Sequence, residues 1–447
     1  MNPTVGVAAA RGVRPSTSLT ASRGSMEFML ASRRSETLGR MKRVVIVLAA
    51  IASVAQADDR TAITLAQVLA AAARAPAGQI AGHDVAAAEA SVAAASAWPN
   101  PGLHLGTSRL TARLIASATL PLPVFGTVGA ARRVAEAEAQ VVRAEADLGL
   151  RDLRHRVLVG WIELARARAD ATAQQVAARQ AADLVAIATG RLSAGVGADV
   201  DVTVAIAARA RADVASAAAR RVEDAASAEL AGVLGWDPER LLQAEGALVT
   251  GPAGDLETLR GRLRAHPERA AAERRIGVAE ANVAQVQSSR WPGLALEGEV
   301  DYDDVSITEG RTAWDRTDAR IGVALELPVF ARLGARARAA QATAQAQRAR
   351  LAAIDAELGG RLVAAHARWR AATERLTALE HDVLPAHDKA AALSMQAYRE
   401  GARDLSSALV AERDLAAVRA EVNDARATAA LAFAELAVAA GEDIHAN

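Results

Sequence analysis

The chain has 447 residues, and its 52 lysines and arginines balance 52 aspartates and glutamates, so the formal net charge is zero. A chain without net charge creates no field that would attract nucleic acid or an anionic lipid surface. Cysteine is absent, which excludes disulfides, a thiol nucleophile, a thiolate metal site and the cysteine of a lipoprotein anchor. Alanine dominates the apolar residues and aromatics make up only 3%, a composition that suits closely packed helices better than a thick globular core.

The N-terminal region carries an export signal. Residues 41–57 run from a basic start through an apolar stretch too short to span a bilayer to the small residues Ala55 and Ala57. We therefore predict a signal peptide, with Asp58 as the mature N-terminus, rather than a buried helix. Residues 1–40 are interpreted as a non-native or disordered lead-in.

The first element with a clear pattern is a β-hairpin over 102–122. Apolar leucines alternate with other residues here, although Arg109 and Arg113 crowd the middle. Trp98 precedes this hairpin and Trp291 precedes its later counterpart. Two roles stay open for these tryptophans, a place at a membrane–water interface and packing at a helix end.

Two long segments have the periodicity of coiled coils. No proline occurs between residues 132 and 194, so a helix of about 60 residues, near 90 Å long, is expected there. Apolar or small residues recur at gaps of three and four in this segment and in the last one. They are Leu150, Leu153, Val157, Gly160 and Leu164, then Leu415, Val418, Val422, Ala425 and Ala429. The pattern is also compatible with an ordinary cytosolic coiled coil.

A second hairpin shows a stronger alternation. Residues 294–302 alternate apolar or small side chains with mostly acidic ones, and residues 321–327 repeat the pattern after a polar loop, 303–318. Such a period of two is typical of a transmembrane β-hairpin that is apolar toward lipid and polar toward a lumen. The acidic face consists of Glu297, Glu299, Asp301 and Glu326. In a symmetric assembly, each of these residues would be repeated in every copy and would form an acidic ring that favours cations.

Four strands cannot close a membrane barrel, and an open sheet edge in lipid leaves backbone groups unpaired. Closure therefore requires oligomerisation.

The chain contains an internal duplication. Leu122-Pro123-Val124-Phe125 returns as Leu327-Pro328-Val329-Phe330 after 205 residues, and Gly195 returns as Gly401 after 206. Pro101-Gly102-Leu103 returns as Pro292-Gly293-Leu294 after 191 residues. We predict repeats at 58–250 and 251–441, followed by a tail at 442–447. The glycines mark turns between consecutive long helices.

No motif for catalysis is found. The sequence has no phosphate loop, dinucleotide fingerprint or nucleophile elbow. His381-Asp382 and His387-Asp388 are interpreted as a solvated helix break at Pro385 rather than as a metal site. We expect no cofactor, no metal and no enzymatic activity.

Each repeat runs in the order helix, β-hairpin, long helix, helix. With this order present twice, residues 61–441 resemble the TolC family of outer-membrane efflux ducts. Tyr398–Leu405 is similar to the family's second-repeat helix turn. The family's strand-to-helix junction is similar to Leu327–Phe330 together with the following Gly334-Ala335-Arg336. This stretch also faintly resembles the corresponding stretch of heavy-metal efflux ducts. The resemblance implies a mainly α fold with a small β part, in which three chains form a coiled-coil barrel and a 12-stranded β-barrel.

The family resemblance also implies a function. It implies a passive duct in the outer membrane with a periplasmic helical extension, within a tripartite efflux system of the RND type. The partners would be two further copies, a periplasmic adaptor (membrane fusion) protein, an inner-membrane efflux pump and outer-membrane lipid, with no nucleic acid. The rival hypothesis is a non-transporting periplasmic or cytosolic coiled-coil scaffold.

The same resemblance places a periplasmic gate at the glycine turns. Tyr398 and Arg403 match the tyrosine and arginine of the second-repeat turn, and Asp201 matches their acidic partner. Ser407 and Val410 stand where the best-known members have an aspartate ring, although Asp199 or Asp404 could substitute. The alternative is that these residues are ordinary surface charges.

Overall fold

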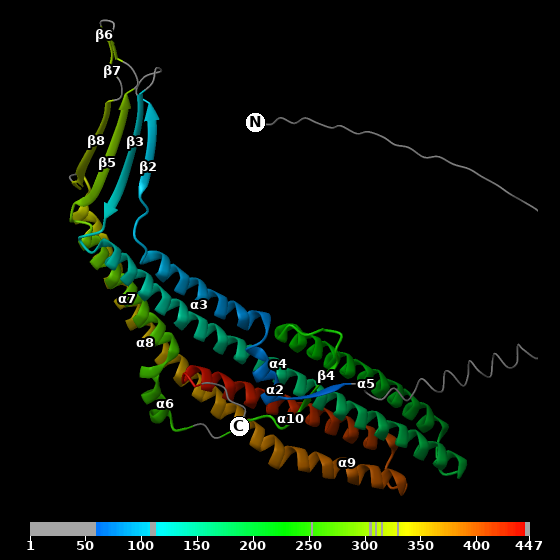
Figure 1. Ribbon diagram of the computed structural model, residues 1–447. Coiled ribbons are helices and arrows are strands. Elements are labelled where there is room, and N and C mark those ends of the chain that lie inside the picture. The colour runs from blue at the N-terminus through cyan, green and yellow to red at the C-terminus, as the bar shows by residue number, and fades with distance from the viewer. Residues whose placement is uncertain are drawn as a thin grey trace, which may run out of the picture. The chain divides into compact units, whose positions relative to one another are not determined.

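The computed structural model describes residues 60–107, 113–251, 254–303, 306–308, 311–313, 316–328 and 330–442. The predicted lead-in 1–40, the signal peptide 41–57, Arg109 and most of the tail lie outside these residues. The described residues belong to one compact unit, Arg60–Asn447 (Figure 1).

Both repeats are built from long helices. The first contains α2 (Leu65–Ala72), α3 (Pro76–Ala95), α4 (Thr127–Ser193) and α5 (Asp199–Leu234). The second contains α6 (Leu256–Arg262), the 3-10 turn η1 (Leu263–Ala265), α7 (Pro267–Ser288), α8 (Leu333–Ala378), the π-helical turn η2 (Leu379–Val383), α9 (Leu384–Arg399) and α10 (Leu405–Ala439). At 67 residues, α4 is about 100 Å long. Within the described residues, no helix is both long and apolar enough to cross a membrane.

Local sequence accounts for several helix ends. Thr64 and Gln67 form a reciprocal capping box at the start of α2. Pro76 and Pro267 occupy the first positions of α3 and α7, where a missing N–H costs nothing.

The predicted coiled-coil seams are confirmed. Leu153, Val157 and Leu164 of α4 are buried, as are Leu415 and Val418 of α10. Alanines complete both seams and let the helix backbones approach closely, which explains why few aromatic residues are needed.

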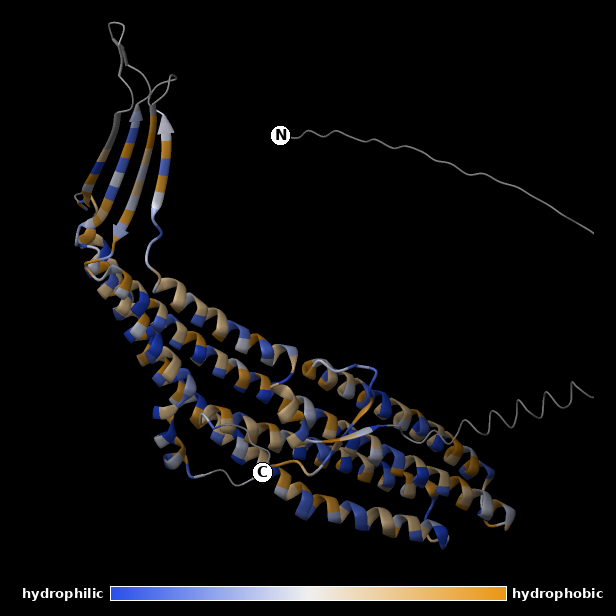
Figure 2. Cartoon of the chain, in the orientation of Figure 1, coloured by the Kyte–Doolittle hydropathy of each residue, from blue (hydrophilic) through white to orange (hydrophobic). Residues whose placement is uncertain are grey.

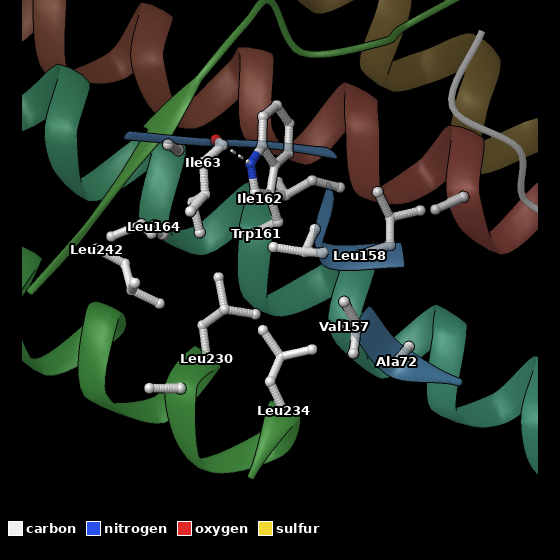
Figure 3. Close-up of a cluster of buried hydrophobic side chains, with 14 of the residues drawn as sticks. Ile63, Ala72, Val157, Leu158, Trp161, Ile162, Leu164, Leu230, Leu234 and Leu242 are labelled. Atoms are coloured by element: carbon white, nitrogen blue, oxygen red, sulfur yellow. Dashed lines mark hydrogen bonds between the residues drawn. The ribbon is translucent and has the colours of Figure 1, made fainter. Parts of the chain in front are cut away.

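The largest hydrophobic cluster lies where the two repeats meet beside a small parallel sheet. Strand β1 (Thr61–Thr64) pairs with β4 (Leu242–Glu245). Trp161 of α4 packs in this cluster with Leu230 and Leu242, and its indole N–H donates to the carbonyl of Ile63 at 3.5 Å (Figure 3).

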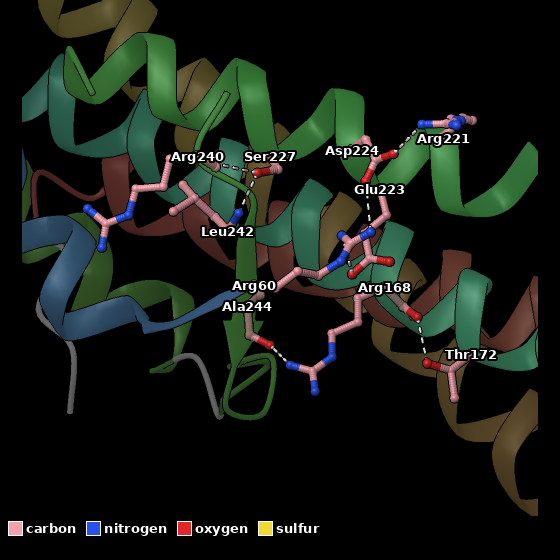
Figure 4. A network of polar contacts seen from close by, with 10 residues as sticks. All are labelled: Arg60, Arg168, Thr172, Arg221, Glu223, Asp224, Ser227, Arg240, Leu242 and Ala244. Atoms are coloured by element: carbon pink, nitrogen blue, oxygen red, sulfur yellow. Dashed lines mark hydrogen bonds and ion pairs between the residues drawn. The ribbon is translucent and has the colours of Figure 1, made fainter. Parts of the chain in front are cut away.

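Polar contacts tie this small sheet to the helices. Arg60 forms ion pairs with Glu223 at 3.1 Å and with Asp224 at 2.7 Å (Figure 4). The backbone N–H of Leu242 donates to the hydroxyl of Ser227 at 2.6 Å. Because the side chains of Arg60 and Glu223 are both buried, removing Arg60 would take this cation away from a carboxylate in the interior, which is costly.

The chain remains helical around Pro385, so the predicted helix break is wrong. Helix α8 continues through η2 into α9, and Pro385 lies in the first turn of α9. The wider π turn accommodates the ring and the missing N–H without ending the helix.

The two predicted hairpins form one antiparallel sheet at one end of the helices (Figure 1). Its strands are β2 (Gly102–Thr107), β3 (Arg113–Leu122), β5 (Gly293–Asp303) and β8 (Arg316–Glu326), in the order β2-β3-β5-β8. The segment predicted as a plain polar loop contains a further small hairpin, β6 (Ser306–Thr308) with β7 (Arg311–Ala313). The fold is thus mainly α with a small β part, as predicted.

Candidate functional site

The two glycine turns share one geometry. Gly195 has φ +76° and Gly401 has φ +77°, a left-handed conformation that glycine adopts without strain. The N–H of Val196 donates to the carbonyl of Arg191 at 3.0 Å, and the N–H of Ala402 donates to that of Ala397 at 2.8 Å. Both turns therefore end their helices with the same hydrogen-bonded motif.

Arg191 connects the two turns, and sequence analysis did not identify it. Its Nη1 donates to the carbonyl of Tyr398 at 2.6 Å and to that of Arg399 at 3.3 Å. Its guanidinium lies 5.1 Å from the centroid of the Tyr398 ring. A Cβ at Gly401 would lie 3.2 Å from Nη1 of Arg191, so Gly401 leaves room for this bridge.

The side chain of Tyr398 is buried beneath this arginine. It is only 1% exposed and packs with Leu184 of α4, Ala205 of α5 and Leu405 of α10. Among the described residues its hydroxyl has no hydrogen-bond partner. Burial raises the pKa of Tyr398, and the nearby carboxylate of Asp201 raises it further.

The predicted gate residues differ in their surroundings. Asp201, in the first turn of α5, lies near Tyr398, so the structure brings these two together. Arg403 is exposed, and its guanidinium forms no hydrogen bond or ion pair within the part of the chain that the structure describes. Asp404 precedes α10 and accepts hydrogen bonds from the hydroxyls of Ser406 and Ser407, which lower its pKa.

The large sheet has two chemically different faces. Opposed residues of antiparallel strands point to the same face, and the register pairs Leu296 with Val323 and Leu294 with Leu325. Figure 2 shows the resulting alternation of hydrophobic and hydrophilic residues along the strands. Leu103, Leu105, Leu296, Val300, Ile321, Val323 and Leu325 are all exposed on the apolar face.

The other face carries all four predicted lumen acids. The register places Glu297, Glu299, Asp301 and Glu326 on this polar face. The structure adds Arg320, whose guanidinium forms ion pairs with Glu299 at 3.1 Å and with Asp301 at 3.5 Å. Sequence analysis missed Arg320, although its even spacing from Glu326 along the strand would have placed it on this face.

Coiled helical hairpins that end in a two-faced antiparallel sheet define a channel-forming subunit. A family model described as outer membrane efflux protein matches residues 68–236 and 262–442. The chain belongs to the outer membrane efflux protein family, which confirms its resemblance to the TolC family. No match was found among curated proteins.

Solved structures share the fold. The outer membrane protein VceC from Vibrio cholerae is 19% identical, with a TM-score of 0.66 over 85% of this chain and 96% of that one. The MtrE outer membrane channel of Neisseria gonorrhoeae is 18% identical, with a TM-score of 0.67 over 85% and 89%. The CmeC outer membrane channel of Campylobacter jejuni is 12% identical, with a TM-score of 0.66 over 84% and 85%.

The family fixes the general function and location. The protein is an efflux duct of the outer membrane, and its long helices extend into the periplasm. This confirms the predicted duct, and the rival scaffold is not favoured. The family is one of efflux channels rather than of enzymes.

Proposed function

We propose that three copies of this chain form a passive duct within a tripartite efflux system of the RND type. A periplasmic adaptor would connect the duct to an inner-membrane pump that supplies the energy. The observation that carries this proposal is the four-stranded sheet, which has one exposed apolar face and two edge strands, β2 and β8.

The edges explain why several copies are required. An unpaired backbone group in the bilayer core costs several kcal/mol, so neither β2 nor β8 can face lipid unpaired. Three four-stranded sheets would close a barrel of twelve strands with apolar side chains toward lipid and polar ones toward the lumen. We propose residues 58–250 and 251–441 as the two repeats of each mature chain, exported by the signal peptide at 41–57.

The gate is proposed at the end of the helices that holds Gly195 and Gly401. Tyr398 lies close to Asp201 of the same chain, and exposed Arg403 is available to a neighbouring copy. Exposed ion pairs are worth only about 0.2 to 1 kcal/mol each, but threefold symmetry repeats each one. Such contacts can hold an entrance closed without contributing much to folding.

A double substitution tests the gate. Tyr398→Phe combined with Arg403→Ser should raise single-channel conductance and leave trimer yield unchanged. Since the Tyr398 hydroxyl has no hydrogen-bond partner among the described residues, the phenylalanine should cost little within one chain. Arg209→Ser, which removes an exposed α5 arginine paired with Asp213, is the matched control. Unchanged conductance in a normally assembled double variant would contradict the proposed gate.

The polar face of the sheet is proposed to line a cation-preferring lumen. Among the residues of this face whose side chains the structure describes, the four acids Glu297, Glu299, Asp301 and Glu326 outnumber Arg320. Charges in a confined pore are also weakly screened. In planar bilayers, Arg320→Gln should strengthen the preference for potassium over chloride and Glu299→Gln should weaken it. A channel that prefers chloride would refute this assignment.

Gene deletion tests which class of compound the duct exports. We propose a duct without cofactor or enzymatic activity. The junction that includes Gly334 resembles heavy-metal efflux ducts, so metal ions and antibiotics are the two cargo classes to compare. If metal ions are exported, a deletion strain should become sensitive to them and regain resistance with the intact gene. Sensitivity to antibiotics alone would favour drug export instead.

A further inference from the structure

The two repeats meet in the sheet through an internal joint. Strand β3 of the first repeat pairs with β5 of the second, with Leu122 opposite Leu294 and Leu120 opposite Leu296. An aromatic pair lies at the end of this joint that is nearer the helices. The ring of Phe125, which follows β3, stacks on Trp291, which precedes β5, with centroids 5.6 Å apart and planes at 9°.

The chain holds both halves of this joint a second time, and neither half has a partner among the residues that the structure describes. The duplication makes β8 the counterpart of β3 and β2 the counterpart of β5, and these are the two edge strands. Phe330 is the counterpart of Phe125 and is 97% exposed. Trp98 is the counterpart of Trp291 and is 64% exposed.

We propose that the β8 edge of one copy pairs with the β2 edge of the next copy in the register of the internal joint. The duplication then sets Leu327 opposite Leu103 of the next copy and Leu325 opposite Leu105. Phe330 stacks on Trp98 of the next copy, as Phe125 stacks on Trp291 within the chain. This inference rests on the proposed trimeric duct and specifies its subunit interface.

The chemistry of the strands agrees with this register. Leu325 and Leu105 both belong to the apolar face, so that face continues across the boundary between copies. A slip by one residue would oppose Leu325 with His104 of the polar face and is excluded. In the proposed register His104 instead lies opposite Glu326, so a carboxylate meets an imidazole on the polar face.

One difference between the repeats affects the aromatic pair and not the strands. Trp291 directly precedes Pro292, whereas Pro99 and Asn100 separate Trp98 from the equivalent Pro101. Trp98 therefore reaches Phe330 from a linker that is two residues longer. The strand register is fixed from Leu103 onward and is unaffected by this linker.

The absence of native cysteine allows a direct test by cross-linking. The full chain carrying Leu325→Cys and Leu105→Cys should form covalent trimers when membranes are oxidised. The matched pairs Leu325→Cys with Leu103→Cys and Leu325→Cys with Thr107→Cys represent slips of two residues in either direction. Directly opposed Cβ atoms lie about 5 Å apart and diagonal ones about 7 Å, so the first pair should cross-link about fivefold more.

The controls separate this inference from the proposed function. Each single-cysteine variant alone should give no covalent product, and co-expression of the two should give only dimers, which shows that the bond joins different copies. Maximal cross-linking in a slipped pair, with trimers present before oxidation, would overturn the register alone. A chain that forms no trimer on unheated gels would overturn the proposed duct as well.

The aromatic stack has its own test. Trp98→Ala and Phe330→Ala should each lower the temperature at which the trimer dissociates, and the double variant should lose no more than the larger single loss. Ile80→Ala, at an exposed position on α3, should leave that temperature unchanged. Additive losses, or no loss in either single variant, would overturn the stack.

Discussion

Arg191 joins the two turns at the end of the helical hairpins. It lies in the last turn of α4, and its guanidinium reaches carbonyls of the α9–α10 turn. Hydrogen bonds from a charged donor are worth about 1.5 to 3 kcal/mol, more than an exposed ion pair. Arg191 therefore fixes the two turns to each other within one chain, without any contact between copies.

Replacing Arg191 should loosen both turns. We expect Arg191→Ala to speed amide hydrogen exchange around Gly195 and Gly401 about tenfold, since it removes hydrogen bonds and the contact with the Tyr398 ring. Arg209→Ala, which removes only an exposed pair on α5, serves as the comparison. The same exchange rates in both variants would show that Arg191 does not hold the turns.

The duplication that revealed the glycines could not reveal Arg191. The residue at the same distance before Gly401 is Ala397, so the second repeat offers no matching arginine. An arginine near a helix end also has an ordinary explanation, because it interacts favourably with the terminal carbonyls. Only the three-dimensional approach of the two turns shows that this arginine bridges them.

At the level of elements, His266 links the start of α7 to the end of α10. Its Nδ1 accepts the N–H of Glu268 at 3.2 Å, and its Nε2 lies 3.2 Å from the carbonyl of Val438. The contact with Glu268 requires neutral imidazole with Nδ1 as the acceptor, and the Nε2–H donor to Val438 is present in that tautomer. Burial lowers the pKa of His266 below its ordinary value of 6.5.

This junction should weaken in acid. Because the folded-state pKa is lowered, the stabilisation is complete above pH 6.5 and is lost as pH falls through the folded pKa. The protection factor of the amides at the start of α7, which is their exchange rate corrected for the intrinsic pH dependence of exchange, should therefore be lower at pH 5 than at pH 7.5 by about 1 kcal/mol, or about fivefold. His266→Asn keeps a capping side chain that does not titrate, so it should abolish this loss of protection. An unchanged pH dependence in that variant would contradict the role of His266.

The apolar face of the sheet should not tolerate a charged side chain. Val323 is 65% exposed on that face, where an arginine near the bilayer midplane costs about 2 to 4 kcal/mol. Val323→Arg should reduce assembled oligomer on unheated gels much more than Glu297→Arg on the polar face. Equal losses would mean that the faces are wrongly assigned.

Periodicity predicted the regular elements well and the irregular ones poorly. Gaps of three and four predicted α4 and α10, and a period of two predicted both hairpins, because burial on one side imposes those patterns. The π turn η2 leaves no such pattern, since Pro385 is equally compatible with a helix break. The β6–β7 hairpin is polar and short, so it resembled a loop.

The architecture of the whole molecule consists of one duplicated unit, and the sheet that the two units form has two edge strands that are unpaired within the described part of the chain. Two hairpins of helices pack through alanine-rich seams, and two hairpins of strands form a sheet that cannot end in lipid. The number of copies is not encoded in any single residue. It depends on how many sheets close the barrel, which explains why sequence patterns predicted oligomerisation and the family resemblance supplied the trimer.

The most direct test is the conductance of the intact protein in planar bilayers. The account predicts that purified protein runs as a heat-sensitive trimer, inserts into lipid and produces discrete, cation-preferring single-channel steps. These steps should disappear when Val323→Arg prevents assembly. A protein that stays monomeric, or a native trimer that inserts without conducting, would contradict the central claim that this chain builds an outer-membrane duct.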